Sequence, residues 1–225
     1  MKKAVLNSLY KCFYQWSKME EFCCAAGCAA CCSQNVTLTA QEGARILDFL
    51  RKEGQDHLVY EKIKALPSWP KPKQTTNEYV LTSLQNQETE QDSVRRQGPC
   101  PFLSKNHCTI YPVRPFSCRC FASETKCMTD IAAAVPEHYL YGSIVVMQLI
   151  EHLDQFHHWG YMTDMLLYLY GSNIDKETTK NLLISKPLPG FFLTEQHNDR
   201  VQLLIDSIFT TQIGTKTIEQ ILNGQ

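Results

Sequence analysis

The sequence lacks several features that would point to common classes of protein. Its 22 Lys and Arg residues are balanced by 23 Asp and Glu residues, which leaves a net charge of −1. Without an excess of basic residues there is no electrostatic footprint for nucleic acid. We therefore expect no nucleic-acid binding, and bulk charge selects no other partner.

Long hydrophobic runs are also missing. The most apolar stretch, residues 139–150, is interrupted by polar residues such as Gln148, whereas a membrane-spanning helix needs about 20 apolar residues. Near the N-terminus, Asn7 and Lys11 interrupt any apolar core of a secretory signal. We therefore expect no membrane association and a cytoplasmic location.

The sequence contains no Gly-rich phosphate loop, no G-x-S-x-G and no H-E-x-x-H. It also shows no alternation of strand and helix patterns and no repeat of 20 to 50 residues. Apolar residues instead recur at intervals of three and four in residues 4–22 and again from Pro136 to Gly160, which is typical of helices. Further helices are predicted at 39–52, 56–66, 161–170, 175–184, 195–210 and 215–223, with Thr39, Asp175, Thr194 and Thr215 as candidate caps.

Cysteine is the residue that the sequence has in excess. Ten of the eleven cysteines fall in two segments, residues 23–32 and 100–127, and only Cys12 stands apart, as a predicted buried hydrophobe. In a reducing compartment such a density indicates metal or redox chemistry rather than disulfides. The odd count and two pairs of adjacent cysteines, which would form strained bridges, also argue against a disulfide framework. We predict that the two segments meet and bind metal through thiolates.

The spacing within the first segment suits a metal ion. Cys28-x2-Cys31 lets one tight turn present two sulfurs to one ion, and Cys24 brings a third from the preceding turn. Because Cys31 and Cys32 are neighbours, their side chains diverge, so they bind adjacent metals or only one of them binds directly. Thiolates are soft ligands that select Zn²⁺, Cu(I) or iron–sulfur clusters.

The second segment is rich in proline and carries two arginines. Pro112 and Pro115 stiffen the loop, which lowers the entropy lost on chelation. Four thiolates on Zn²⁺ leave a formal charge of −2, and Arg114 and Arg119 are the predicted neutralisers of that charge. His107 adjoins a cysteine and is an alternative ligand, but we interpret it as a turn residue because loop histidines are usually solvated.

Five motifs occur together in the two segments. They are Cys24-x3-Cys28-x2-Cys31-Cys32, Leu38-Thr-x-x-Glu42, Cys100-Pro-Phe-Leu, Cys108-x-Ile-Tyr111 and Arg114-Pro-x-x-Cys118-Arg119-x-Phe121. This combination resembles the YkgJ-like CxxCxxCC family of zinc- or iron-chelating proteins. The resemblance implies a metal-chelating cysteine cluster and supplies no reaction. Ala29 stands where the family commonly has glycine, and Cys23 and Cys120 look like extra cysteines.

We expect eight metal ligands: Cys24, Cys28, Cys31, Cys32, Cys100, Cys108, Cys118 and Cys127. Eight thiolates suit two tetrahedral zinc sites or one to two iron–sulfur clusters. The expected fold is mainly α, with an irregular cysteine-rich metal-binding core formed by two loop segments. Residues 1–130 would form this metal-binding domain, including an exposed connector at about 67–97 with a short strand at 78–84. Residues 131–225 would form a helical C-terminal region packed on it.

The predicted function is metal binding by a cluster that is structural or carries metal, with no assigned reaction. An alternative is a cluster-dependent enzyme acting on a protein, either methylase-like or redox, because the resemblance extends weakly to flagellin lysine methylases. The Cys24-x3-Cys28-x2-Cys31 spacing is also used by radical S-adenosylmethionine enzymes, but their fold needs strand–helix units that this sequence lacks. In a third hypothesis, the C-terminal helices bind a protein partner while the metal centre only folds the N-terminal half.

Overall fold

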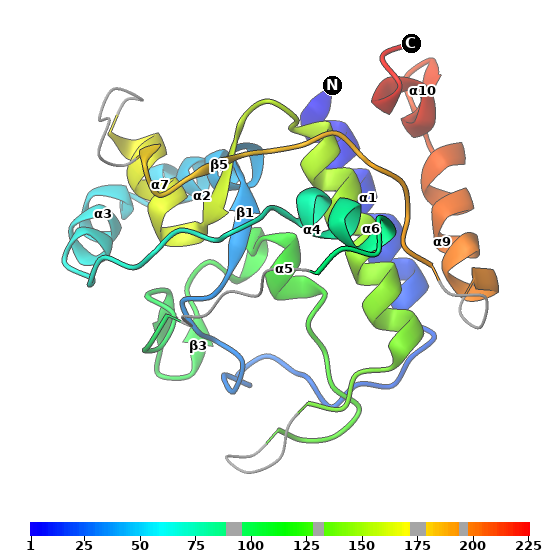
Figure 1. Ribbon diagram of the computed structural model, residues 1–225. Helices are drawn as coiled ribbons and strands as arrows, with labels where there is room; N and C mark the ends of the chain where they lie inside the picture. Colours follow the sequence, from blue (N-terminus) through cyan, green and yellow to red (C-terminus); the bar gives the residue numbers. More distant parts are fainter. Residues whose placement is uncertain (89–95, 128–132, 172–178, 194–197) are drawn as a thin grey trace.

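The computed structural model describes residues 1–88, 96–127, 133–171, 179–193 and 198–225 (Figure 1). The fold is mainly α, as predicted, with a few short strands. None of the helices in these ranges is long and apolar enough to cross a membrane. The elements are α1 (Lys2–Ser17), β1 (Thr37–Thr39), α2 (Ala40–Lys52), α3 (Asp56–Lys64), α4 (Thr76–Leu84), β2 (Leu103–Ser104), β3 (His107–Cys108), the 3₁₀ helix η1 (Tyr111–Val113), α5 (Phe116–Arg119), α6 (Glu137–Leu153), β4 (His158–Tyr161), α7 (Met162–Tyr170), β5 (Leu183–Ile184), α9 (Asn198–Thr210), β6 (Gln212–Ile213), β7 (Lys216–Thr217) and α10 (Ile218–Leu222).

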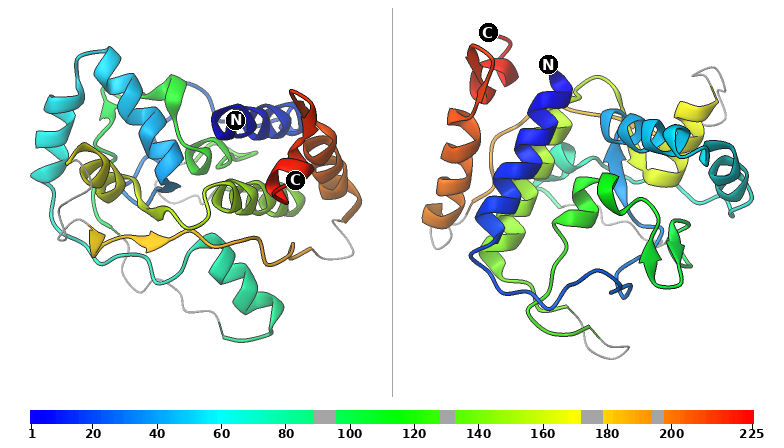
Figure 2. Two further views of the ribbon diagram at one scale, coloured as in Figure 1. Left: turned by 90° about the horizontal axis from the view of Figure 1, so that it is seen from above. Right: turned by 180° about the vertical axis from the view of Figure 1, so that it is seen from behind.

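One half of the molecule is a layer of long helices. Figure 2 shows α1 and α6 lying side by side, with α9 next to them and the two chain ends at the same end of the layer. The predicted apolar stripe of α1 is buried here, with Leu9 and Phe13 at its centre. Tyr139 on α6 and Phe116 on α5 pack their rings against Phe13, at centroid distances of 5.3 Å and 4.8 Å. This aromatic cluster forms one wall of the site described below.

Gly142 allows α1 and α6 to approach closely. A Cβ atom at this position would lie 2.6 Å from Trp16 Cη2, which is shorter than any tolerated contact. We therefore expect Gly142→Ala to lower the free energy of unfolding by about 1–3 kcal/mol, measured by urea denaturation. The penalty should shrink in a Trp16→Phe background, where the smaller ring removes the clash; equal penalties in both backgrounds would contradict this explanation.

The other half of the molecule is built around a small antiparallel sheet in the order β1-β4-β5. Leu38 pairs with Gly160 and Thr39 with Trp159. Helices α2, α3 and α7 surround a second apolar core that includes Leu38. Thr39 ends β1 and also caps α2, with the reciprocal Thr39–Glu42 capping box that the sequence predicts.

The strand predicted at 78–84 is wrong, because these residues belong to helix α4. Thr75 and Glu78 form a second capping box, which starts the helix in the same way as in α2. Asn77, within the predicted exposed connector, is only 1% exposed, and its backbone N–H donates to Glu151 Oε2 at 2.9 Å. The polar composition of this segment does not indicate a helix, because buried hydrogen bonds to distant residues stabilise it.

Several other boundaries differ from the predictions. Helix α1 ends at Ser17 rather than at residue 22, and α6 ends at Leu153 because the chain then pairs with β1 as β4. In the predicted helix 175–184, Asp175 lies outside the described residues, as does Thr194. Leu183 and Ile184 form strand β5 instead. Helix α10 is capped by Thr217 rather than by Thr215, since the Thr217 side chain accepts from Gln220 N–H.

Candidate metal centre

The first cysteine segment, residues 23–32, is a loop made of local turns. Backbone hydrogen bonds of 3.0 Å close one turn over residues 25–28 and another over residues 29–32. Gly27 has a φ of 92°, a backbone conformation that glycine adopts at no steric cost. The turns place both cysteines of the Cys28-x2-Cys31 motif on the edge of the same cavity.

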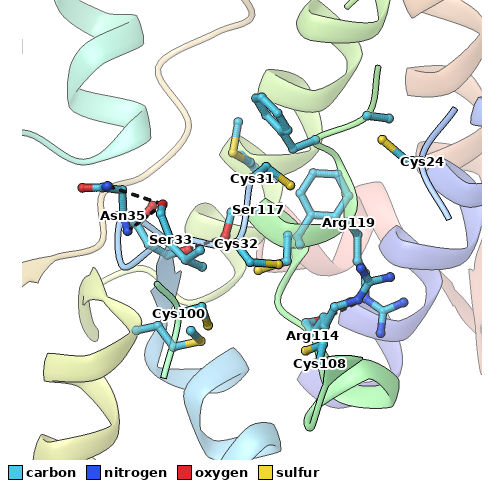
Figure 3. Close-up of a pocket in the computed structure, with 18 of the residues that line it drawn as sticks. Cys24, Cys31, Cys32, Ser33, Asn35, Cys100, Cys108, Arg114, Ser117 and Arg119 are labelled. Carbon is cyan, nitrogen blue, oxygen red and sulfur yellow. Dashed lines mark hydrogen bonds between the residues drawn. The ribbon is translucent and has the colours of Figure 1, made fainter. Parts of the chain in front are cut away.

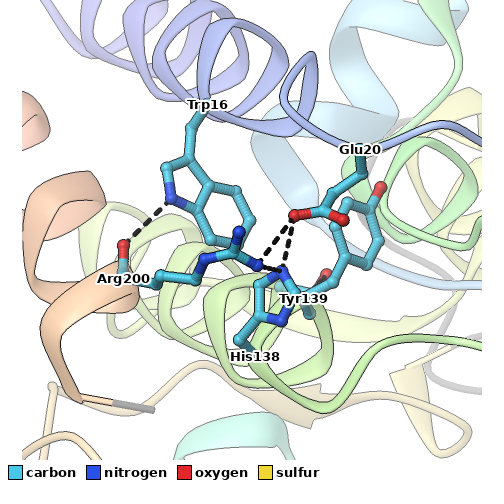
Figure 4. Close-up of polar contacts among 6 residues, drawn as sticks. Trp16, Glu20, His138, Tyr139 and Arg200 are labelled. Carbon is cyan, nitrogen blue, oxygen red and sulfur yellow. Dashed lines mark hydrogen bonds and ion pairs between the residues drawn. The ribbon is translucent and has the colours of Figure 1, made fainter.

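The chain reaches this segment from the end of α1, where polar side chains hold it against two helices (Figure 4). Glu20 Oε1 lies 2.7 Å from His138 Nε2 on α6 and 3.2 Å from Arg200 Nη1 on α9. Trp16 Nε1 donates to the Arg200 carbonyl oxygen at 3.0 Å. The start of the first cysteine segment is therefore fixed to the helical layer.

The second cysteine segment begins with a hairpin. Strands β2 and β3 pair, so that Cys108 lies opposite Leu103. The turn between them uses positive φ angles at Lys105 and Asn106, 48° and 63°. His107 is exposed, and its Nδ1 lies 2.9 Å from the Lys105 carbonyl oxygen, in keeping with its interpretation as a turn residue. Helix α5 then carries Cys118.

The two segments meet, as the sequence predicts. The Cys100 N–H donates to the Cys32 carbonyl oxygen at 3.0 Å, and Ser33 forms an isolated β-bridge with Pro99. At the other end of the loop, the Cys23 N–H donates to the Ser123 carbonyl oxygen at 2.8 Å. Cysteines that are about 70 to 100 positions apart in the sequence are thereby brought together.

A cavity of about 1300 Å³ lies between the two segments (Figure 3). Its wall includes no Asp, Glu or His among the described residues, so sulfur is the only strong metal donor that its side chains offer. Seven of the eight predicted ligands line it: Cys24, Cys28, Cys31, Cys32, Cys100, Cys108 and Cys118.

The remaining cysteines lie away from the cavity wall. Cys127, the eighth predicted ligand, is close enough to Cys24 for the two thiols to interact electrostatically. Cys120 is buried, and its thiol donates to the Ser117 carbonyl oxygen at 3.7 Å. The thiol of Cys23 donates to the Glu124 carbonyl oxygen at 3.0 Å, and Cys12 is buried in the helical core, as predicted.

Electrostatic contacts between thiols divide the predicted ligands into two groups. In the first group, Cys118 interacts with Cys100 and Cys108, and Cys32 interacts with both of these. In the second group, Cys24 interacts with Cys28 and Cys127, and Cys31 interacts with Cys24 and Cys28 but most strongly with Cys32. Cys32 also contacts Cys28 and Cys31, so the groups adjoin. We call Cys32, Cys100, Cys108 and Cys118 the inner group, and Cys24, Cys28, Cys31 and Cys127 the outer group.

Burial keeps several of these thiols protonated. Removal from water, reinforced by neighbouring thiols, raises the pKa of Cys31 to about 11. Burial likewise raises the pKa of Cys100 to about 11 and places the pKa of Cys118 well above the ordinary range. Since metal binds the thiolate, binding at this cavity must release protons.

Arg114 is one of the cations near the inner group, together with Lys62 beside Cys100 and Arg119 beside Cys118. The positive charge of Arg114 offsets part of the rise that burial causes in the pKa of Cys32 and of Cys118, while its guanidinium lies 3.7 Å from the centroid of the Tyr111 ring. Arg119, the other predicted neutraliser, donates from Nε to the Arg114 carbonyl oxygen and from Nη2 to the Pro112 carbonyl oxygen, both at 2.8 Å. Arg119 therefore also shapes the loop that presents Arg114.

Glu42 joins the second cysteine segment to α1, a contact that the capping-box motif in the sequence does not predict. The carboxylate is 4% exposed and accepts hydrogen bonds from the Phe116 N–H at 2.8 Å, from the Tyr10 hydroxyl and from the Thr39 N–H at 3.1 Å. Burial raises its pKa, and these hydrogen bonds oppose that rise. Because Phe116 begins the helix that carries Cys118, Glu42 positions an inner-group thiol.

We expect Glu42→Gln to lower the free energy of unfolding by about 2–3 kcal/mol, because the amide leaves buried donors without an acceptor. The matched control is Glu78→Gln in the α4 capping box, whose side chain is 35% exposed. This control should cost no more than about 1 kcal/mol. Urea denaturation of the metal-free proteins compares them, and equal costs would show that the buried network adds nothing to the cap.

The residues around the cavity fit a soft metal. Within the described parts of the chain, no three His, Cys, Asp or Glu side chains are already arranged to hold an ion. The thiols border a shared space, and an ion would have to draw them together. Sulfur-only donors with an adjacent guanidinium suit Zn²⁺ or iron, whose thiolate complexes carry excess negative charge.

Comparison with known proteins gives one match. The model of the CxxCxxCC family, described as a "putative zinc- or iron-chelating domain", matches residues 23–135. This range contains both cysteine segments and all eight predicted ligands. No curated protein and no solved structure matches the chain.

Proposed function

Because the chain belongs to the CxxCxxCC family, we propose that it binds zinc or iron through thiolates from both cysteine segments. The observation that carries this proposal is the convergence of seven thiols on one cavity that has no carboxylate or imidazole in its described wall. All eleven cysteines are free thiols, which is consistent with a reducing compartment such as the cytoplasm.

The inner and outer groups would each supply four thiolates to a centre. Four thiolates match a closed tetrahedral zinc site, and they also match the ligand set of an iron–sulfur cluster. Zinc would supply structural cross-linking, whereas an iron–sulfur cluster would supply electron transfer. Arg114 would offset part of the negative charge at the inner group, and Cys23 and Cys120 would remain outside both centres.

Elemental mass spectrometry of the full chain, purified without oxygen, tests this function. We expect about two zinc ions per chain, or iron with matching sulfide and a visible absorption band. Substituting all four inner-group cysteines with serine should halve the bound metal. A folded protein that takes up no metal under these conditions would remove the proposal.

The size of the cavity favours a second candidate, an enzyme that acts on a protein through a methylase-like or redox reaction. A volume of about 1300 Å³ exceeds the space that two ions need and is larger than the roughly 300–1,000 Å³ typical of sites for organic molecules, so such a molecule would fit. Aromatic residues such as Tyr79, Phe121 and Tyr139 contribute to its wall. Calorimetry with S-adenosylmethionine tests the methylase form, and no heat at millimolar concentration would argue against it.

A further inference from the structure

The inner and outer thiol groups differ in their exposure to solvent. In the outer group, Cys24, Cys28 and Cys31 are exposed residues, although the sulfur of Cys31 is itself partly desolvated, and Cys127 is partly buried. The four inner-group cysteines are all partly buried, and the Cys118 thiol is strongly desolvated. Three of the four outer-group residues are therefore more accessible to an incoming ligand than any inner-group residue, while Cys127 resembles the inner group in this respect.

Two outer-group cysteines, Cys28 and Cys31, lie in a stretch with fewer long-range backbone hydrogen bonds than the inner-group cysteines, whereas Cys24 follows Cys23, which is bonded to Ser123. Cys32 and Cys100 are joined by a backbone hydrogen bond, Cys108 lies in a hairpin, and the helix of Cys118 is tied to Glu42. Over residues 25–31, by contrast, the backbone hydrogen bonds of the described chain are all local to the loop. Segments with few long-range bonds open at lower free energy than segments tied into the core.

We propose that the outer group is an exchange site, from which metal passes to and from an external thiolate donor, while the inner group retains its metal. This inference rests on the proposed metal-binding function. In such an exchange, Cys28 or Cys31 would be the leaving thiolate and would take up the proton that the incoming thiol donor releases, so that protons balance. The inner-group cysteines would meanwhile hold the two segments together.

Chelator competition on the zinc-loaded full chain tests the inference. With excess 4-(2-pyridylazo)resorcinol as the probe, we expect one zinc equivalent to leave at least tenfold faster than the second. Cys28→Ser should abolish the fast phase of zinc release. Cys100→Ser should abolish the slow phase. Cys23→Ser, which changes an exposed thiol outside the cavity, is the control and should preserve both phases.

The outcomes separate the two proposals. A chain that holds no thiolate-bound zinc would overturn the proposed function, whereas release of two equivalents at one rate would overturn only the division into exchanging and retained sites. Loss of the slow phase in Cys28→Ser would also overturn this division.

If a variant does not fold, alkylation of the zinc-loaded natural chain by N-ethylmaleimide provides the same comparison. Mass spectrometry should find Cys28 and Cys31 modified before Cys100 and Cys118, and the reverse order would overturn the inference.

Discussion

Replacing an inner-group thiol, as in Cys118→Ser or Cys100→Ser, is expected to remove one metal equivalent from the chain. Loss of a group that merely supports a ligand costs about 10–100-fold in metal affinity, so loss of a ligand should cost at least about 100-fold. Cys100 should show a large effect because the first segment is attached beside it through the Cys32–Cys100 backbone bond, and Cys118 because its thiol is strongly desolvated. Titration of the metal-free protein with zinc against a competing chelator measures the change.

Cys120→Ser is the matched control for Cys118→Ser, since both residues lie at the end of α5. Cys120 is buried away from the cavity wall, and its thiol donates to a backbone carbonyl that a hydroxyl can also reach. This variant should keep the full metal content and an affinity within about threefold of the natural chain. A large loss in Cys120→Ser and none in Cys118→Ser would show that the wrong sulfur has been assigned.

Acidification is expected to weaken metal binding steeply. The thiols of Cys31 and Cys100 have pKa values raised to about 11, so they carry protons at neutral pH and must lose them to bind metal. Each displaced proton lowers the apparent affinity about tenfold per pH unit, and a site with four thiols therefore loses up to about 10⁴-fold per unit. Zinc titrations between pH 6 and pH 8 should give this slope, while a slope near zero would exclude thiol ligands.

The same shifts predict the opposite dependence for the stability of the metal-free protein. A thiol whose pKa is raised by folding binds its proton more tightly in the folded than in the unfolded state. Its stabilising contribution is complete below the ordinary pKa of 9.0 and is lost as the pH rises toward about 11. Urea denaturation of the metal-free chain should therefore show stability falling across this range, and constant stability would contradict the desolvation of these two thiols.

Local sequence patterns predicted a large part of this fold. The apolar stripe of α1 and the capping box at Thr39 and Glu42 predicted helices that are present in the structure. The helix α4 was missed because its buried anchor, Asn77, is polar, and the sequence does not show that Glu151 and the Lys186 carbonyl lie nearby to bind it. The short strands were missed for a related reason, since a strand of two to four residues depends on a partner that is distant in the sequence.

For the candidate site, cysteine spacing predicted that the two segments would meet, and the Cys32–Cys100 bond shows that they do. The spacing did not reveal which thiols are neighbours, because the hairpin turn and the position of α5 set the places of Cys108 and Cys118. It also did not reveal that Glu42 reaches the Phe116 N–H. Such contacts depend on how the helices pack, which local sequence does not specify.

X-ray absorption spectroscopy of the metal-loaded full chain tests the central claim most directly. If sulfurs from both segments bind the same ions, the zinc-loaded protein should show four sulfur neighbours at about 2.3 Å. Cys100→Ser should then lower the average sulfur count or the amount of bound zinc, although the first segment is unchanged. Nitrogen or oxygen neighbours at about 2.0 Å in the natural chain, or an unchanged sulfur shell and zinc content after substitution of Cys100, Cys108 and Cys118 together, would contradict the account.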